Sequence, residues 1–351
     1  MLANRLNNFD AIRIGAALLV IYGHAFPLSG MASPGIIGSS VQTLGVKIFF
    51  AISGFLIAKS WIKDPHVLRF LWKRVLRIFP ALILVVVLTA CVLGPLVTEV
   101  ALGGYFSDPA FRNYFWNIAL NIHYHLPATF ANLKYPGAVN GSLWSLPAEF
   151  FMYLMTPLLL LAKRYKVLLG GIACVFAALG PWAMANLPAT PIVYYGSNLW
   201  QWLDVIPFFI VGAWMATFRS DWKPNLQIGI AAFMALLLFK MPDMVQVTLF
   251  TFVLPYLVLA YAFASPPQFP QAARYGDISY GLYLYGFPMQ QLTSMMIGPN
   301  PQSWQLFLYP LPAIVLLSFM SWHLVEKRAL KLKDLVGRQK APALEPKPAE
   351  V

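Results

Sequence analysis

Charged residues are scarce in this sequence. Only 11% of its 351 residues are Asp, Glu, Lys or Arg, whereas soluble globular domains contain about 25%. Hydrophobic residues make up 59%, and the mean hydropathy is +0.65. This balance excludes an ordinary soluble protein and predicts an all-α integral membrane protein.

Cysteine and the common cofactor motifs are also nearly absent. The two cysteines, Cys91 and Cys174, lie in apolar stretches, which argues against a disulfide framework. The sequence has no Walker loop, dinucleotide glycine motif, zinc motif or G-x-S-x-G elbow. His123 and His125 have no carboxylate or cysteine beside them, so we expect no metal site and no permanently bound cofactor.

Ten apolar stretches have about the ~20 residues that a helix needs to cross a bilayer. They predict a polytopic bundle with spans at 9–29, 41–61, 76–97, 144–162, 167–184, 200–217, 225–240, 244–263, 277–297 and 304–325. No soluble domain fits between them, and no internal repeat is visible. We therefore expect one transmembrane domain over residues 1–333 and a disordered cytoplasmic tail over 334–351, which is polar and rich in proline.

The net charge of +12 follows this topology. With an even number of spans, 20 Lys and Arg residues fall on the side of the two termini, and only Arg112, Lys134 and Lys240 fall on the other side. The positive-inside rule then places both termini in the cytoplasm. The basic charge thus indicates membrane orientation and not a nucleic-acid partner.

Two polar residues stand out in the first span. Arg13 and His24 are 11 residues apart, which on a helix is about 16 Å of rise and only about 20° of rotation. They therefore share one helical face, although an arginine within a membrane helix costs roughly 2.5–3.5 kcal/mol. The alternative is an arginine that snorkels to the inner headgroups and a histidine at the outer interface.

The outer ends of two later spans carry acids. Glu149 lies at a depth that matches His24, so a carboxylate–imidazole pair could support His24 as a general base. Glu149 could equally be stabilised by its own helix dipole. Asp204 either joins this cluster or caps its helix, and we favour the cap. Trp144, Trp200 and Trp202 could stack on sugars or belong to an interfacial aromatic belt.

At the cytoplasmic start of the third span, Arg74 and Arg77 are three residues apart and share a helical face. Such a pair can simply anchor the helix, or it can bind pyrophosphate and phosphate oxygens.

Several segments, in this order, resemble the membrane-bound acyltransferase 3 family, the bacterial polysaccharide O-acyltransferases. They are "FDAIRIGAALLVIYGH", "FFAISGFLIAKS", "KRVLRIFPAL", "WSLPAEFFMYL" and "ISYGLYLYGFPM". The resemblance covers nearly all the spans. It implies that His24 is catalytic, Arg13 an essential partner and Glu149 a functional acid, with Arg74 and Arg77 as acyl-CoA contacts.

The resemblance also implies a location in a bacterial inner membrane. As candidate acceptor-side or supporting residues we select Ser142, Trp144, Asp204 and Tyr283. One position departs from the family pattern, because Gly286 stands where many members have histidine. We expect no extra hydrolase-like domain of the kind that some members contain.

These features predict a membrane O-acyltransferase that moves an acyl group, acetyl by the resemblance, from cytoplasmic acyl-CoA to a hydroxyl of an envelope or secreted glycan. The transfer would use His24 and Glu149, either directly or through an acylated histidine. The expected partners are acyl-CoA, the glycan, the bilayer and polysaccharide-assembly proteins. A transporter or flippase of a polar lipid-linked substrate, and a non-catalytic assembly or sensor protein, are the alternatives.

Overall fold

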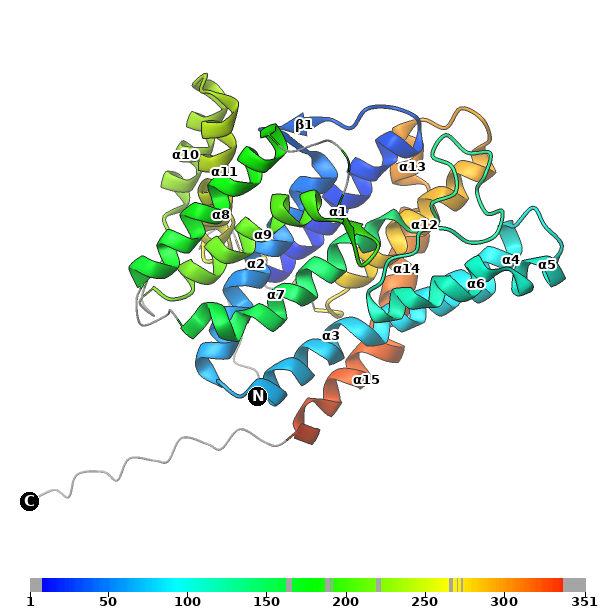
Figure 1. Ribbon diagram of the computed structural model, residues 1–351, viewed down its shortest axis with the longest axis horizontal. Coiled ribbons are helices and arrows are strands. Elements are labelled where there is room, and N and C mark those ends of the chain that lie inside the picture. Colours follow the sequence, from blue (N-terminus) through cyan, green and yellow to red (C-terminus); the bar gives the residue numbers. More distant parts are fainter. Residues whose placement is uncertain are drawn as a thin grey trace, which may run out of the picture.

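Helices account for most of the computed structural model, which describes residues 8–336 apart from 162–165, 187–189, 191, 219–221, 265–267, 270 and 273 (Figure 1). Most of the predicted tail therefore lies outside the described residues. The longer helices are α1 (Phe9–Leu28), α2 (Val41–Lys63), α3 (Val67–Leu88), α7 (Ser145–Leu159), α8 (Lys166–Asn186), α9 (Leu199–Met215), α10 (Leu226–Leu238), α11 (Asp243–Ala262), α12 (Ser279–Ile297) and α14 (Leu311–Ser321).

Shorter helical segments connect and extend these helices. They are the π-helices η1 (Thr89–Leu93) and η5 (Trp322–Glu326), the 3-10 helices η2 (Phe115–Ala119), η3 (Gly141–Trp144) and η6 (Leu330–Val336), and the α-helices α4 (Gly94–Val97), α5 (Leu102–Ser107), α6 (Pro109–Tyr114), α13 (Ser303–Leu308) and α15 (Lys327–Ala329). Four two-residue strands form two hairpins, β1 (Gly35–Ile36) with β2 (Ser39–Ser40) and β3 (Val193–Tyr194) with β4 (Ser197–Asn198).

Six helical segments in the described part of the chain are long and apolar enough to cross a membrane. They are Phe9–Leu28, Val41–Lys63, Val67–Val97, Lys166–Ala183, Asp243–Ala262 and Ser303–Val336. The predicted class of multi-pass helical membrane protein is confirmed. The helices α9 and α10 are apolar but shorter, so the count of ten spans stays a prediction. The third helix begins at Val67 and not at 76. Its first turns carry basic residues, which the apolar run used for the prediction does not include.

Two parts of the chain repeat one order of elements, which contradicts the expectation of no repeat. A helix, a hairpin and a second helix occur as α1–β1–β2–α2 and again as α8–β3–β4–α9. The two hairpins are offset by 158 residues in the sequence: β1 begins at Gly35 and β3 at Val193, and β2 begins at Ser39 and β4 at Ser197. Both hairpins turn through two residues with positive φ, Ile37–Gly38 and Tyr195–Gly196, as two-residue hairpin loops require.

The two units meet where α2 packs against α9. A Cβ atom added to Gly54 would lie 2.0 Å from the carbonyl oxygen of Phe209, and one added to Gly212 would lie 2.3 Å from that of Ala51. Gly212 and Phe209 are the 158-residue counterparts of Gly54 and Ala51, so the contact is symmetric. Glycine allows membrane helices to approach this closely.

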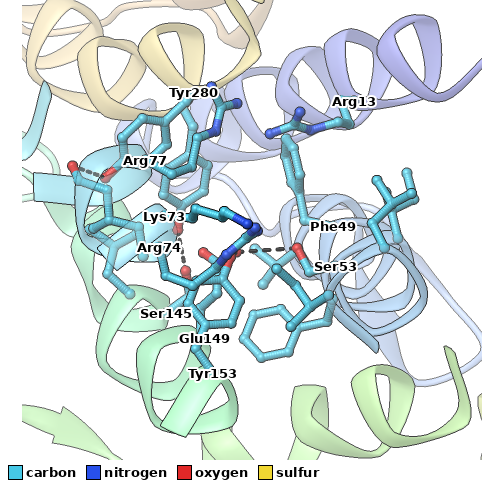
Figure 2. Close-up of a pocket in the computed structure, with 18 of the residues that line it drawn as sticks. Arg13, Phe49, Ser53, Lys73, Arg74, Arg77, Ser145, Glu149, Tyr153 and Tyr280 are labelled. Carbon is cyan, nitrogen blue, oxygen red and sulfur yellow. Dashed lines mark hydrogen bonds between the residues drawn. The ribbon is translucent and has the colours of Figure 1, made fainter. Parts of the chain in front are cut away.

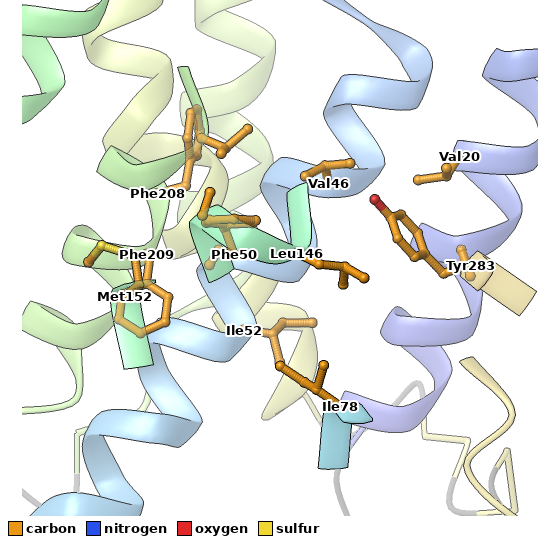
Figure 3. Close-up of a cluster of buried hydrophobic side chains, with 14 of the residues drawn as sticks. Val20, Val46, Phe50, Ile52, Ile78, Leu146, Met152, Phe208, Phe209 and Tyr283 are labelled. Atoms are coloured by element: carbon orange, nitrogen blue, oxygen red, sulfur yellow. The ribbon is translucent and has the colours of Figure 1, made fainter. Parts of the chain in front are cut away.

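Large apolar side chains fill the space beside this contact. Phe50 of α2, Phe208 and Phe209 of α9 and Met152 of α7 are all buried, and Figure 3 shows them grouped between these helices. Leu146 continues the cluster toward α1. The core therefore fixes α7 against the repeat, and α7 carries Glu149.

A buried ion pair crosses the same helix contact. The Lys47 ammonium of α2 lies 2.7 Å from the carboxylate of Asp204 in α9 and donates to Ser39 Oγ at 2.6 Å. The cap expected from Asp204 is therefore wrong. Asn198 caps α9 instead, with its side-chain oxygen accepting from the Trp200 amide at 3.0 Å.

Candidate active site

A cavity of about 310 Å³ lies between α1, α2, α3, α7, α12 and η6, and Figure 2 shows the side chains that line it. Among the described residues, its charged lining side chains are five basic ones and one acid: Arg13, Lys73, Arg74, Arg77, Lys333 and Glu149. The remaining lining is largely apolar. A cavity with this excess of positive charge favours an anionic ligand.

Arg13 and Arg77 share one carboxylate. Nη1 of Arg13 and Nη2 of Arg77 each donate to Oδ2 of Asp277 at 2.6 Å. The other oxygen of Asp277 accepts from the hydroxyl of Ser279 at 2.6 Å. Arg77 also lies 3.9 Å from a carboxylate oxygen of Glu326. Both guanidiniums are thus held in place, and they share the negative charge of Asp277.

Arg74 has a different environment, although it lies only one turn from Arg77. No carboxylate of the described residues lies within 4.0 Å of its guanidinium. Its buried Nε atom has no hydrogen-bond partner in the described part of the chain. The guanidinium carbon lies 5.6 Å from the Phe70 ring. The two arginines predicted as one phosphate site therefore differ in their partners. Arg74 is the one that can still bind an anionic ligand.

Glu149 faces the cavity and has partners there. One of its oxygens accepts from Ser53 Oγ at 3.2 Å and from the Tyr153 hydroxyl. Figure 2 shows Lys73 and Arg74 of α3 extending toward it. No hydrogen bond within the described residues joins Glu149 to His24.

His24 lies outside the lining of this cavity. Its side chain is buried, and its ring packs edge-on against Phe287 with 5.2 Å between the ring centroids. Its Nδ1 atom has no hydrogen-bond partner in the described residues. Arg13, on the same helix, does line the cavity. The predicted common path for Arg13 and His24 is therefore not an open channel in this structure.

A hydrogen-bonded turn lies between the cavity and His24. The Tyr283 hydroxyl, at the cavity wall, donates to the Ser142 carbonyl, and it pairs with Ser145 Oγ at 2.6 Å. A Cβ atom on Gly141 would lie 2.6 Å from the Phe287 ring, the ring that also contacts His24. The segment from Gly141 to Ser145 thus has Tyr283 on one side and Phe287 on the other.

Two glutamines of α12, which the sequence analysis missed, lie near the His24 end of α1. Gln290 donates through Nε2 to the carbonyls of Ile21 and Leu306, and Gln291 donates to those of Tyr135 and Ala138. These bonds fix both amides, and both Oε1 atoms are buried without a partner in the described residues. Acceptor atoms without donors suit a ligand that brings hydroxyl groups.

The remaining predicted site residues are buried or packed against other side chains of the bundle. Ser142 Oγ is buried without a partner among the described residues, and Trp144 packs against the core. The Trp202 indole is buried and donates to Ser197 at 2.6 Å, so its ring faces are not open to a sugar. A Cβ atom on Gly286 would lie 2.8 Å from the Ile21 side chain, so a larger residue at this position would require Ile21 to shift.

Asp277, which binds both Arg13 and Arg77, is the site residue that the sequence analysis missed most clearly. The signal was present, because an acid two positions before Ser279 and directly ahead of an apolar span is a helix-start pattern. Among the described residues, no group of three or more His, Cys, Asp or Glu side chains could hold a metal ion.

Comparison with known proteins identifies the family. A family described as "Acyltransferase domain" matches residues 6–323. The chain belongs to the membrane-bound acyltransferase 3 family. An O-acetyl transferase of Shigella phage Sf6 is 31% identical over 333 residues, covering 93% of this chain and 97% of the relative.

Further relatives point in the same direction. Nodulation protein 10 of Rhizobium leguminosarum is 31% identical over 363 residues, covering 95% of this chain and 96% of that protein. The peptidoglycan O-acetyltransferase OatA of Listeria monocytogenes is 24% identical over 332 residues, 81% of this chain and 50% of its own length. No solved structure matches. This family member is therefore a multi-pass membrane acyltransferase.

Proposed function

We propose that this acyltransferase moves an acetyl group from cytoplasmic acetyl-CoA to a hydroxyl of an envelope or secreted glycan, from a bacterial inner membrane with both chain termini in the cytoplasm. The observation that carries the proposal is the cavity with five basic side chains and one acid. It lies toward the Arg13 end of α1, the end that the positive-inside rule places in the cytoplasm. The O-acetyltransferase relatives support acetyl transfer.

On the donor side, Arg74 is the phosphate or thioester contact, because it lines the cavity without a carboxylate partner among the described residues. Arg13 and Arg77 contribute positive charge to the cavity, and Asp277 holds both of them at its wall. Glu149, with Ser53 and Tyr153, offers an oriented polar group beside Arg74. These groups position the donor.

On the acceptor side, His24 is the general base. It takes the proton from the glycan hydroxyl as the hydroxyl oxygen attacks the thioester carbonyl carbon; the C–S bond breaks, an ester C–O bond forms, and the thiolate leaves as the CoA thiol after proton return. Gln290 and Gln291 accept hydrogen bonds from the other hydroxyls. Because the turn at 141–145 and Tyr283 separate the cavity from His24, the donor arm must displace them to reach the histidine.

The test is acetyl transfer by the purified full-length protein in detergent or nanodiscs. Wild type is incubated with radiolabelled acetyl-CoA and the glycan of the host strain, and transfer is compared with His24→Ala and with the exposed control His125→Ala. We expect His24→Ala to bind acetyl-CoA and to lose transfer, while the control retains it. Transfer that persists in His24→Ala would disprove the role of the histidine. A wild type that neither binds nor uses acetyl-CoA would disprove the donor.

A further inference from the structure

The last described helical segment contributes to the cavity. Leu330 and Lys333 of η6 line it together with Lys73 of α3. The Lys333 side chain is exposed, and the Lys73 side chain is 30% exposed. Both lysines therefore lie where the cavity meets solvent, whereas the Arg74 Nε atom is buried inside.

One hydrogen bond aligns these two lysines. The indole nitrogen of Trp72 donates to the carbonyl oxygen of Leu332 at 2.9 Å, and each of these residues directly precedes one of the lysines. Because α3 and η6 pack along each other, Lys73 and Lys333 are held on two sides of one opening.

The two lysines at the opening are only partly balanced by carboxylates of the described residues. No carboxylate of the described residues lies within 4.0 Å of Lys333. Lys73 lies 3.2 Å from Asp64, but this acid also pairs with Arg69 at 2.6 Å. Among the ion pairs of the described residues, the two ammonium groups thus have only Asp64, which they share with Arg69, and this suits a phosphorylated ligand.

The size of the cavity indicates which part of a donor enters. At about 310 Å³ it is at the small end of ligand pockets, which measure roughly 300–1,000 Å³. Apart from the basic side chains, its walls are largely apolar and include Val46, Phe49 and Leu146, so this part of the cavity suits a slender chain better than a charged nucleotide. A coenzyme A thioester has both parts, a flexible arm and a nucleotide with three phosphates.

We infer that the pantetheine arm of the donor occupies the cavity while Lys73 and Lys333 bind the phosphates of its nucleotide at the opening. This inference rests on the proposed function, because it assigns a subsite for the proposed donor. It gives the C-terminal segment of the bundle a role in donor recognition.

The test compares three donors on four forms of the full-length protein. The donors are acetyl-CoA, 3′-dephospho-acetyl-CoA and S-acetylpantetheine, which lacks the nucleotide and all three phosphates. The forms are wild type, Lys73→Gln, Lys333→Gln and the control Lys331→Gln, an exposed lysine of η6 that does not line the cavity. We expect each of the first two substitutions to raise the KM for acetyl-CoA about fivefold with kcat unchanged, the scale of one solvent-screened charge contact.

The phosphate-free donor makes the result specific. Its KM should be the same for all four forms, and the response of 3′-dephospho-acetyl-CoA shows which phosphate each lysine binds. The effect should persist in nanodiscs of purely zwitterionic lipid; an effect that appears only with anionic lipid would assign the lysines to lipid headgroups and overturn the inference. A KM for acetyl-CoA that is unchanged in Lys333→Gln, or raised equally for all donors, would also overturn it. If wild type does not use acetyl-CoA at all, the proposed function itself fails.

Discussion

Arg77 and Asp277 lie 200 positions apart in the sequence and meet at 2.6 Å. The same carboxylate oxygen accepts from Arg13 at 2.6 Å, so one atom joins α1, α3 and the start of α12. All three side chains are largely buried, with 16–22% of each exposed. Without this carboxylate, two guanidiniums would face each other in a region of low dielectric.

The first prediction follows from this arrangement. Asp277→Asn should destabilise the protein by about 3 kcal/mol, because removing one partner of a buried pair leaves an uncompensated charge. Thermal unfolding in detergent, followed by tryptophan fluorescence, measures the change. Asp243→Asn is the control, since Asp243 is exposed in the first turn of α11. An Asp277→Asn protein as stable as this control would contradict the role of the carboxylate.

The second prediction separates the two arginines of α3. Arg74→Gln should keep the unfolding temperature of wild type and raise the KM for acetyl-CoA about tenfold, since Arg74 has no carboxylate partner in the described residues and faces the cavity. Arg77→Gln should mainly lower stability, because it leaves Asp277 and Glu326 with one cation fewer. Unfolding scans and donor kinetics on both variants distinguish the two roles. Equal effects of the two substitutions on both measurements would refute the division.

The sequence could predict the helices because their main cause is local. Apolar runs such as 9–29 and 41–61 match α1 and α2 closely, since a run of this length and hydropathy is enough to form a membrane helix. The family motifs located Arg13, Arg74 and Glu149, and all three line one cavity. Helices and motif residues were thus predictable, because short stretches of the sequence determine them.

Contacts between distant segments were not predictable in this way. Asp277 is 264 positions from Arg13, and neither hydropathy nor spacing indicates which carboxylate an intramembrane arginine will meet. The Lys47–Asp204 pair was missed for the same reason. The repeat was missed because the two units preserve backbone requirements, such as Gly54 and Gly212 and the positive-φ turns, while most other residues differ.

The third prediction tests that repeat. Gly54→Ala and Gly212→Ala should each destabilise the protein severely and to a similar extent, because each Cβ would lie within 2.3 Å of a backbone oxygen of the facing helix. Gly15→Ala is the matched control, since a Cβ there meets nothing within 4 Å, and alanine favours the helix by about 1 kcal/mol. Folded yield after membrane extraction and the unfolding temperature are the measurements. Tolerance of alanine at either Gly54 or Gly212 would show that the helices have room to separate.

The last prediction concerns pH. The hydrogen bond from Arg69, together with the smaller contribution of Lys73, lowers the pKa of Asp64 to about 2, although burial partly opposes this effect. In the unfolded chain this pKa is about 3.9. The stabilising contribution of Asp64 is therefore fully present above about pH 4 and is lost as the pH falls through about 2.

Asp64→Asn should accordingly lower the unfolding temperature at pH 6, and its deficit relative to wild type should shrink as the pH is lowered from 4 toward 2. Asp334→Asn removes a carboxylate from an exposed position that makes no ion pair with the described residues, so it controls for the loss of one charge. Unfolding temperatures of the three proteins between pH 6 and pH 2.5 give the comparison. A deficit for Asp64→Asn that stays constant over this range would mean that the ion pair with Arg69 does not stabilise the junction between α2 and α3.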